Sequence, residues 1–414
     1  MLFNLWFCSM TSIQEKINKK KQFILEKVWW YSWFRWKQEE LIDSILSMKD
    51  SFWQFPTWMW KSICFQLPAL MFNWTTIVIS PFVALMKDQV LDLEDTPIWK
   101  YSWYLNSTLD QDQKREMFFK IKNWELKLLY ISPERFVLDS FLQVLSEIPI
   151  SMIVVDEAHL VYQSEDFRPE FWKIWSSIKK LKRMNEQNFP ERKWNIIISA
   201  LTATANEEIR NYIIDSLWMK DPNIIIMDYR RDNLLYYSKF FETEQEKKEA
   251  FIKLCLSLKD VKWVKLVYWI TQNEVEQLAK LLEWYWLKSD YYHAWMKDAR
   301  KEKVHKAFLS NKLDYLCCTL AFWTWINKKD IRVVINYWIT FDILEYAQQS
   351  WRAWRDWLDA WCILLFSNKD IWTKRFLNKW DYQKNMNLNE VVDFWKENKN
   401  DWHSHASFLL DYFQ

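Results

Sequence analysis

The most unusual absence in this chain is that of glycine. None of its 414 residues is Gly, whereas 32 are Trp. Ordinary proteins contain about 7% Gly, so a chain of this length would be expected to hold roughly 29. Gly occupies backbone positions with positive φ that other residues reach only at a steric cost. The missing Gly and the excess Trp therefore need a common explanation.

Trp stands in this sequence where glycine chemistry is needed. Trp58 and Trp60 precede the Lys of FPTWMWKS (55–62), and further Trp residues interrupt SWRAWRDW (350–357). We infer that most Trp positions are Gly in the functional ancestor, through a codon read differently in the source or through deliberate substitution. A protein truly rich in Trp is the alternative, but it leaves the missing Gly unexplained. If about ten sites need left-handed geometry, Trp would cost on the order of 10–20 kcal/mol. A typical domain has about 5–15 kcal/mol of net stability.

Other absences exclude several protein classes. The six Cys residues show no CxxC spacing and mostly lie in apolar runs, which indicates buried, reduced thiols of a cytoplasmic protein. Lys and Arg (56) nearly balance Asp and Glu (54), so local patches would have to hold a nucleic acid. No stretch is apolar enough to span a membrane, and the N-terminal MLFNLWFCSM lacks a basic leader and a cleavage site. We expect no membrane partner.

Short β-branched runs alternate with longer helical patterns along the chain. The first set is TTIVIS (75–80), KLLYIS (127–132), SMIVVD (151–156) and NIIISALTA (195–203). The second set is VKLVYW (264–269), DYLCCTLAF (314–322), RVVINY (332–337) and ILLF (363–366). Continuous apolar strands separated by helices are typical of parallel sheets covered on both faces. The two sets predict two α/β domains that join at the charged stretch 228–233.

FPTWMWKS follows a predicted strand and precedes an apolar helix. With Gly at 58 and 60 it becomes PTGMGKS, a P-loop whose backbone N–H groups and helix N-terminus cradle phosphates. Lys61 would reach the β- and γ-phosphates, and the Ser62 hydroxyl would bind Mg²⁺. With Trp at 58 and 60, two indoles would occupy the concavity that must hold the phosphates. The predicted nucleotide-binding residues of this loop are Thr57, Trp58, Met59, Trp60, Lys61 and Ser62.

Asp156-Glu157-Ala158-His159 ends the apolar strand SMIVV. An Asp at such a strand tip can hold Mg²⁺, often through water, and the adjacent Glu can polarise the attacking water. The structural alternative is an ordinary acidic helix N-terminus. A P-loop upstream in a fold of the right kind favours the catalytic interpretation, with Asp156 and Glu157 as its residues.

The ordered set of motifs resembles the RecQ family of superfamily-two DNA helicases, from about residue 24 to the C-terminus. The resemblance implies an α/β fold of two RecA-like parallel-sheet domains in tandem, with a short helical C-terminal extension. The expected parts are an N-terminal extension (1–23), a first RecA-like domain (24–228), a second RecA-like domain (229–368) and a truncated helical remnant of the zinc-binding region (369–414).

In WYSWFRWKQEE (30–40), the resemblance implies that Tyr31 stacks on adenine while Arg35 and Gln38 read its edge. SPFVALMKDQV (80–90) and LNST (105–108) resemble DNA-contacting segments, and YYHAWM (291–296) resembles a later helicase motif. An ordinary hydrogen-bonded His is the alternative at position 293. The predicted DNA-binding residues are Lys87, Asn106, Ser107, Tyr162, Phe167, Arg168 and His293.

EDFRPEF (165–171) resembles the second half of the family's aromatic-rich loop, which senses single-stranded DNA. The chain departs from the family here: Ser164-Glu165 stands where a Trp-Gly-His run is usual, so the loop is one residue shorter. Tyr162 and Phe167 remain as stacking platforms. SALTATA (199–205) resembles the segment that couples ATP hydrolysis to strand separation. The departure in the aromatic-rich loop leaves open how strongly DNA binding is coupled to ATP hydrolysis.

YAQQSWRAWRDW (346–357) is the most specific match, because with Gly it contains QQSGRAGRDG. The resemblance makes Arg355 the arginine finger on the γ-phosphate, with Arg352 and Gln348 completing the site. Such an Arg contributes a factor of roughly 10³–10⁵ to phosphoryl transfer.

The family normally continues into a zinc-binding subdomain and a winged helix. Ser404 stands at the position of the first zinc Cys, and the chain stops at Gln414. His403 and His405 alone supply two ligands, so we predict no zinc site. We expect duplex engagement to be weaker or to depend on a protein partner that supplies the missing modules.

These observations predict an ATP-dependent 3′-to-5′ DNA helicase that uses ATP and Mg²⁺ between its two domains and acts on single-stranded and partly duplex DNA. It would be cytoplasmic, and nucleoid-associated in a bacterium. One rival is an RNA-directed DEAH-type helicase, against which FRPEF and the adenine segment argue. The other is a non-hydrolysing nucleic-acid-binding or regulatory protein, favoured if Trp58, Trp60, Trp351 and Trp354 are truly Trp.

Overall fold

The structure of the chain is a computed structural model. It describes residues 2–55, 61–81, 86, 89–91, 93–94, 96–105, 111–123, 125–162, 170–191, 195–203, 205–227, 233–319, 328, 330–340, 343–351, 353, 358–377, 388–389 and 392. For 2–13, 97, 111–114, 118, 122, 170–172, 343–344, 348 and 377, the backbone alone is described. The chain forms two compact units, Met1–Met227 and Asp228–Gln414.

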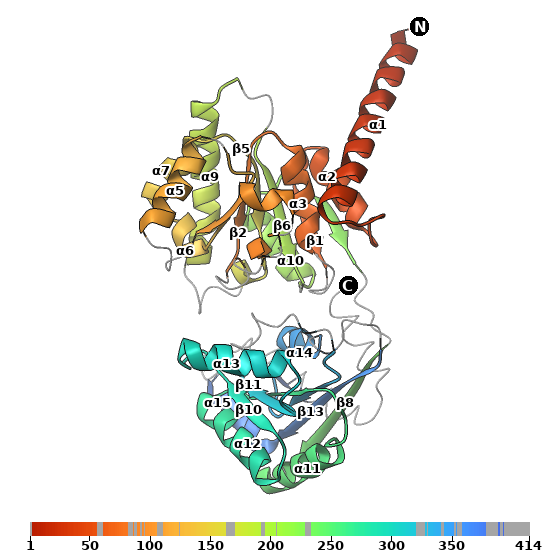
Figure 1. Ribbon diagram of the computed structural model, residues 1–414, viewed down its shortest axis with the longest axis vertical. Helices are drawn as coiled ribbons and strands as arrows, with labels where there is room; N and C mark the ends of the chain where they lie inside the picture. The colour runs from red at the N-terminus through yellow and green to blue at the C-terminus, as the bar shows by residue number, and fades with distance from the viewer. Residues whose placement is uncertain are drawn as a thin grey trace. The chain divides into compact units, whose positions relative to one another are not determined.

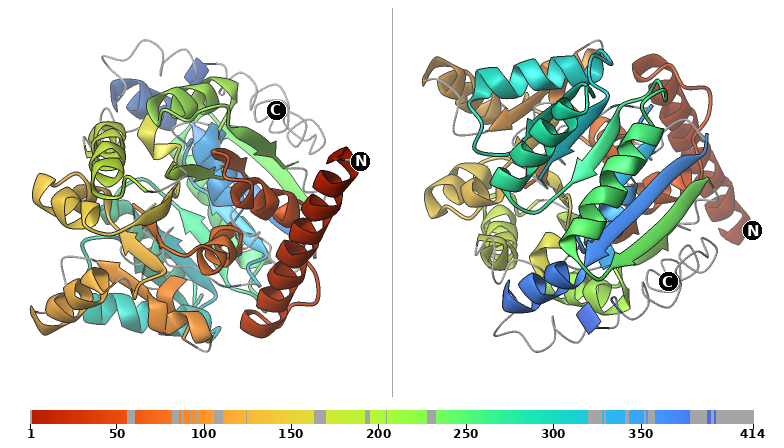
Figure 2. Two further views of the ribbon diagram at one scale, coloured as in Figure 1. Left: turned by 90° about the horizontal axis from the view of Figure 1, so that it is seen from above. Right: turned by 90° about the horizontal axis from the view of Figure 1, so that it is seen from below.

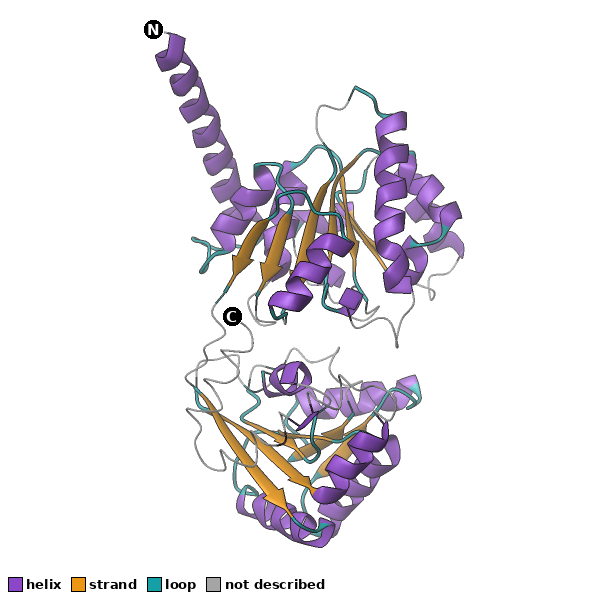
Figure 3. Cartoon of the chain, turned by 180° about the vertical axis from the view of Figure 1, so that it is seen from behind, coloured by secondary structure: helices purple, strands orange, loops and turns teal. Residues whose placement is uncertain are grey.

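The first unit is built on a seven-stranded sheet in which every described pairing is parallel (Figures 1 and 3). Its strands are β1 (Ser51–Gln54), β2 (Thr75–Ile79), β3 (Ser102–Leu105), β4 (Leu128–Ile131), β5 (Ile150–Val155), β6 (Ile197–Thr202) and β7 (Asn223–Ile226). They lie in the order β3-β4-β2-β5-β6-β1-β7. Parallel strands all end at one edge of the sheet, so the segments that follow β5, β6 and β1 are neighbours.

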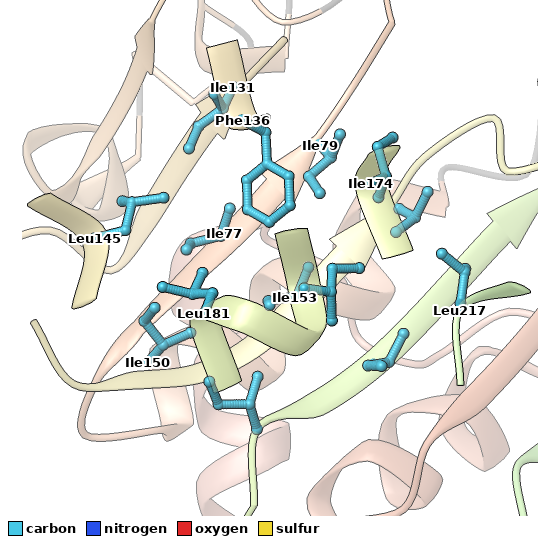
Figure 4. Packing of buried hydrophobic residues seen from close by; sticks show 14 of the residues in the cluster. Ile77, Ile79, Ile131, Phe136, Leu145, Ile150, Ile153, Ile174, Leu181 and Leu217 are labelled. Atoms are coloured by element: carbon cyan, nitrogen blue, oxygen red, sulfur yellow. The ribbon is translucent and has the colours of Figure 1, made fainter. Parts of the chain in front are cut away.

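Two apolar layers cover this sheet because side chains alternate along each strand. Ile77 and Ile79 enter one core with α7, α9 and α10 (Figure 4), whereas Val78 enters the other with α1, α2 and α3. The helices are α1 (Leu2–Val28), α2 (Gln38–Leu46), α3 (Lys61–Met71), α5 (Gln111–Lys122), α6 (Pro133–Phe136), α7 (Asp139–Ser146), α9 (Glu170–Asn188) and α10 (Glu207–Ser216), with a 3₁₀ helix, η1, at Pro97–Tyr101. None of the described helices is long and apolar enough to cross a membrane.

The second unit contains a six-stranded parallel sheet in the order β10-β11-β9-β12-β13-β8. Its strands are β8 (Leu234–Phe241), β9 (Lys265–Tyr268), β10 (Ser289–Tyr292), β11 (Tyr315–Cys318), β12 (Val333–Asn336) and β13 (Ala360–Ser367). Its helices are α11 (Glu244–Ser257), α12 (Gln272–Trp284), α13 (Asp298–Leu309), α14 (Ile343–Ser350) and α15 (Asn368–Leu377). β8 and β13 pair along their whole length (Figure 2, right). The predicted fold class, two parallel-sheet α/β domains, is confirmed.

Several Trp residues adopt the left-handed backbone that Gly favours. Trp218 (φ 56°) and Trp286 (φ 61°) directly follow the C-caps of α10 and α12. At α12, Trp286 N–H donates to Glu283 O (2.9 Å) and Leu287 N–H donates to Leu282 O (3.2 Å). This is the Schellman pattern, whose left-handed residue is usually Gly. Trp286 is 95% exposed, so no packing offsets its strain, and the geometry supports the inference that Gly belongs there.

Candidate nucleotide-binding site

The ends of β1, β6 and β5 bring three sequence motifs to one edge of the first sheet. β6 pairs with β1 on one side and β5 on the other. The P-loop follows β1, and α3 begins at Lys61. Of the predicted loop residues, Thr57, Trp58, Met59 and Trp60 lie outside the described residues. Lys61 and Ser62 are half-buried in the first turn of α3, where the helix N-terminus favours anions.

Asp156 lies at the end of β5 with 5% of its surface exposed. Its N–H donates to Ile79 O (2.9 Å) and so continues the β5–β2 ladder. Burial raises the pKa of Asp156 to about 6 and the Glu157 carboxylate adds to this rise, while Lys61 opposes it. The Lys61 ammonium therefore acts on this carboxyl, although the two residues are far apart in sequence. A buried carboxylate is a hard oxygen ligand of the kind that suits Mg²⁺.

Glu157 is 9% exposed and has a left-handed backbone with φ 49°. A residue with a side chain is rarely found there, and such strain concentrates at functional sites. Its N–H donates to Asp156 Oδ1 (3.0 Å), and its Oε2 lies 3.4 Å from His159 Nδ1. The Glu157 carboxylate is also close enough to Asp156 to raise the pKa of that carboxyl.

His159 joins the DEAH run to the segment after β6. It is 4% exposed, and its Nδ1 lies 3.0 Å from Thr202 Oγ1. Burial lowers the pKa of His159 to about 4, so the ring is neutral at pH 7. Ala158 N–H also donates to Leu201 O (2.8 Å). The sequence analysis assigned no role to His159 or Thr202, although His159 ends the DEAH run and Thr202 lies in SALTATA (199–205).

Tyr31, Arg35 and Gln38 are brought together at the start of α2. Arg35 N–H donates to Gln38 Oε1 (2.9 Å), and Gln38 N–H donates to Arg35 O (3.0 Å). The Arg35 guanidinium lies 5.9 Å from the Tyr31 ring centre. Lys37 Nζ donates to Ile226 O (3.2 Å), which ties the segment to β7 beside β1. The predicted aromatic platform and its two polar companions thus form one cluster.

Comparisons with known proteins agree with this arrangement. A family model described as DEAD/DEAH box helicase matches residues 35–212, and one described as Helicase conserved C-terminal domain matches 246–356. An ATP-dependent DNA helicase RecQ from Synechocystis is 31% identical over 353 residues, which cover 84% of this chain and 71% of the relative. This chain belongs to the RecQ family. RecQ of Bacillus subtilis is 34% identical over 91% of this chain and 62% of its own length.

RecQ of Pasteurella multocida is 34% identical over 86% of this chain and 53% of its own length. The chain thus spans between about half and two thirds of the first curated RecQ relatives that it matches. Solved structures show the fold alone. S. cerevisiae Dbp5 bound to RNA and ADP BeF3 gives a TM-score of 0.65 at 12% identity, covering 95% of this chain and 97% of that one. Mss116 bound to ssRNA and UDP-BeF gives 0.65 at 16% identity over 85% and 73%.

Two of the predicted DNA contacts of this RecQ-family chain are described. Tyr162 is 37% exposed, and its hydroxyl donates to Glu208 Oε1 (3.3 Å). His293 is buried; its Nε2 lies 3.1 Å from Glu276 Oε1, and its ring stacks on Tyr291. His293 is therefore hydrogen-bonded within the protein, and its role as a DNA contact stays a prediction. The other five, Lys87, Asn106, Ser107, Phe167 and Arg168, lie outside the described residues.

The arginine-finger segment is described only in part. Gln348 belongs to α14 through its backbone, while Arg352 and Arg355 lie outside the described residues. His403, Ser404 and His405 lie outside them too. Within the described part of the chain, no group of three or more His, Cys, Asp or Glu could hold a metal ion. The roles assigned to all these residues stay predictions.

Proposed function

We propose that this protein is an ATP-dependent 3′-to-5′ DNA helicase of RecQ type. The observation that carries the proposal is the cluster at the ends of β5 and β6 in a RecQ-family chain. Asp156 and Glu157 lie side by side, Lys61 acts on Asp156, and His159 contacts Thr202. A cation, a metal-binding carboxylate and a water-orienting carboxylate at one strand edge are the parts that phosphoryl transfer needs.

Each residue of the cluster has a proposed role in ATP hydrolysis. Lys61 offsets charge on the β- and γ-phosphates, and Glu157 orients the attacking water. Ser62 and Asp156 would hold Mg²⁺, which neutralises charge on the phosphates when bound. Burial raises the pKa of Asp156, whereas the nearby Lys61 ammonium lowers it and so favours the ionised carboxylate that binds a metal ion. Gln348, Arg352 and Arg355 of the second RecA-like domain are proposed to complete the site.

The proposed substrate is single-stranded and partly duplex DNA. The RecQ relatives are named as DNA helicases, whereas the solved structures of similar fold include RNA-bound proteins. Sequence similarity at 31–34% identity favours the DNA-directed reading over likeness in fold alone. Hydrolysis in the two RecA-like domains would be coupled to translocation along one strand. A cytoplasmic location belongs to the same proposal.

A non-hydrolysing nucleic-acid-binding protein is the second candidate. It is favoured by the sequence itself, which places Trp58 and Trp60 where a P-loop needs close backbone approach to phosphates. The two candidates differ in one property: only the helicase turns over ATP when single-stranded DNA is present.

The deciding experiment measures ATP hydrolysis with and without a single-stranded oligonucleotide. The natural protein is expected to hydrolyse ATP faster with DNA than with RNA of the same sequence. Lys61→Ala should abolish hydrolysis and leave DNA binding in place, because it removes only the phosphate contact. Hydrolysis that single-stranded DNA does not stimulate would count against the proposed function, and stronger stimulation by RNA would favour the RNA-directed rival.

A further inference from the structure

Tyr162 is the last described residue of the helical turn that follows His159, and it contacts the beginning of α10. Its N–H donates to His159 O (3.1 Å), so it lies one turn beyond that residue. Its hydroxyl donates to Glu208 Oε1 (3.3 Å), and its ring meets Tyr212 edge to face, with ring centres 5.3 Å apart at 84°. Two residues of α10 therefore hold both the hydroxyl and the ring of Tyr162.

The segment before this helical turn is held by β6. Ala158 N–H donates to Leu201 O (2.8 Å), and His159 Nδ1 contacts Thr202 Oγ1 (3.0 Å). Beneath the turn, Val161 is buried in the core that also contains Ile209 of α10. Because protein cores are close-packed, a shift of Tyr162 is transmitted through the turn to the segment before it. That segment begins with Glu157.

The chain that follows Tyr162 is the segment whose sequence resembles the aromatic-rich, DNA-sensing loop. Residues 163–169 lie outside the described residues, so the described geometry ends at Tyr162. On the proposed function, DNA bound by that segment would act on the ATP site through the peptide that connects them. Tyr162 is the last described residue of this connection.

We infer that Glu208 and Tyr212 are positioning residues that hold Tyr162, and with it the turn from Glu157 to His159, in the arrangement that lets single-stranded DNA stimulate ATP hydrolysis. The inference rests on the proposed function and adds two residues of α10 to it. Neither residue touches the reacting atoms; both act through Tyr162. Coupling of this kind is a free energy between two sites. Weakening the contacts that transmit it is expected to lower the stimulation of turnover by DNA while each ligand alone binds as before.

The test uses variants of the full chain in its natural form. Tyr162→Phe removes the hydroxyl, and Glu208→Gln removes the charge of its acceptor. Glu207→Gln is the matched control, because Glu207 lies on the same turn with a 75% exposed side chain and pairs with Arg210 instead. Measured quantities are the ATP turnover against concentration of a single-stranded oligothymidylate, the KM for ATP, the oligonucleotide affinity by fluorescence anisotropy, and the unfolding midpoint.

Tyr162→Phe and Glu208→Gln should each lower DNA stimulation of turnover roughly three- to tenfold, the size expected for one weakened charge-assisted hydrogen bond. The double variant should be no worse than Tyr162→Phe alone, because both changes remove the same contact. Tyr212→Leu should act in the same direction through loss of the ring pair. In Glu208→Gln, the KM for ATP and the oligonucleotide affinity should match those of the parent and of Glu207→Gln, and the unfolding midpoint reports any loss of stability separately.

Three results would overturn the inference. Glu208→Gln could behave like Glu207→Gln, or its effect could add to that of Tyr162→Phe. A loss of oligonucleotide affinity in Tyr162→Phe, without one in Glu208→Gln, would make Tyr162 a DNA contact instead. If single-stranded DNA does not stimulate ATP turnover by the parent protein, the proposed function and the inference are both wrong. If DNA stimulates the parent and the variants equally, only the inference is wrong.

Discussion

Glu157 combines two features that are costly for stability. Its carboxylate is buried beside that of Asp156, and its backbone is left-handed, a conformation that costs roughly 1–2 kcal/mol for a residue with a side chain. Strain kept at such a position is typical of sites that pre-organise reacting groups. The sequence identified Asp156 and Glu157 as catalytic candidates because they follow a buried strand. It did not predict the contact of His159 with Thr202, because that partner depends on β6 lying beside β5.

Left-handed Trp residues give a direct test at the residue scale. Trp286→Gly is expected to raise the free energy of unfolding by roughly 1–2 kcal/mol, because Gly reaches positive φ without a steric clash. Trp372, also exposed, lies inside α15, where Gly costs helix propensity. Trp372→Gly is therefore the control and should lower stability by about 0.5–1 kcal/mol. Urea unfolding checks both signs; destabilisation by Trp286→Gly would refute the strain argument.

At the scale of elements, the strands that the sequence predicted lie in the interior of their sheets, whereas those that it missed lie at the edges. The eight predicted runs overlap β2, β4, β5, β6, β9, β11, β12 and β13, which lie inside their sheets, although 363–366 covers only half of β13. The unpredicted β3, β7, β8 and β10 are the four edge strands. An edge strand can be only partly buried, as Asn223–Ile226 is. Its three Ile form a run too short to distinguish a strand from a buried helix segment by pattern alone. The short β1 was expected only as the strand before the P-loop.

A buried charge cluster joins α11 to α15 in the second unit. Lys247 is fully buried, and its Nζ lies 2.6 Å from Asp370 Oδ2 and 2.9 Å from Glu244 Oε1. Its ammonium also faces the rings of Trp269 and Tyr337 at 4.9 and 4.5 Å. Removing one partner of a buried ion pair typically costs about 3–5 kcal/mol. Lys247→Met is therefore expected to destabilise the second unit at pH 8.

The pH dependence of this loss has a definite sign. Burial raises the pKa of Asp370 to about 6, above the ordinary value of 3.8. The folded protein therefore binds this proton more tightly than the unfolded chain, and stability gained from it appears as the pH falls through 6. Lys247 opposes this rise, so Lys247→Met raises the pKa of Asp370 further and the variant gains more stability than the parent as the pH falls. The stability gap between Lys247→Met and the parent, measured by urea unfolding, should therefore be larger at pH 8 than at pH 5. Lys247→Met/Asp370→Leu should recover part of it; a gap independent of pH would contradict this assignment.

At the scale of the whole molecule, the Trp residues bear on stability and activity together. Trp30, Trp36, Trp218 and Trp286 all have positive φ, and all are exposed. Each left-handed Trp costs roughly 1–2 kcal/mol. These four described positions would therefore lower the free energy of unfolding by a large part of the about 5–15 kcal/mol that is typical of a domain. The two P-loop positions add a functional cost, because phosphate binding needs the backbone itself.

The natural protein is therefore expected to weigh less than the chain with 32 Trp, by a whole number of Trp-to-Gly steps. Intact-mass spectrometry counts those steps, and the coding sequence assigns them to positions. A Gly form, with Trp58→Gly and Trp60→Gly among its changes, should hydrolyse ATP when DNA is present, since its backbone can approach the phosphates. The all-Trp form should unfold more readily and show no turnover. A mass of the natural protein that matches 32 Trp would refute the Gly inference. ATP turnover by the all-Trp form would show that the nucleotide site tolerates two indoles.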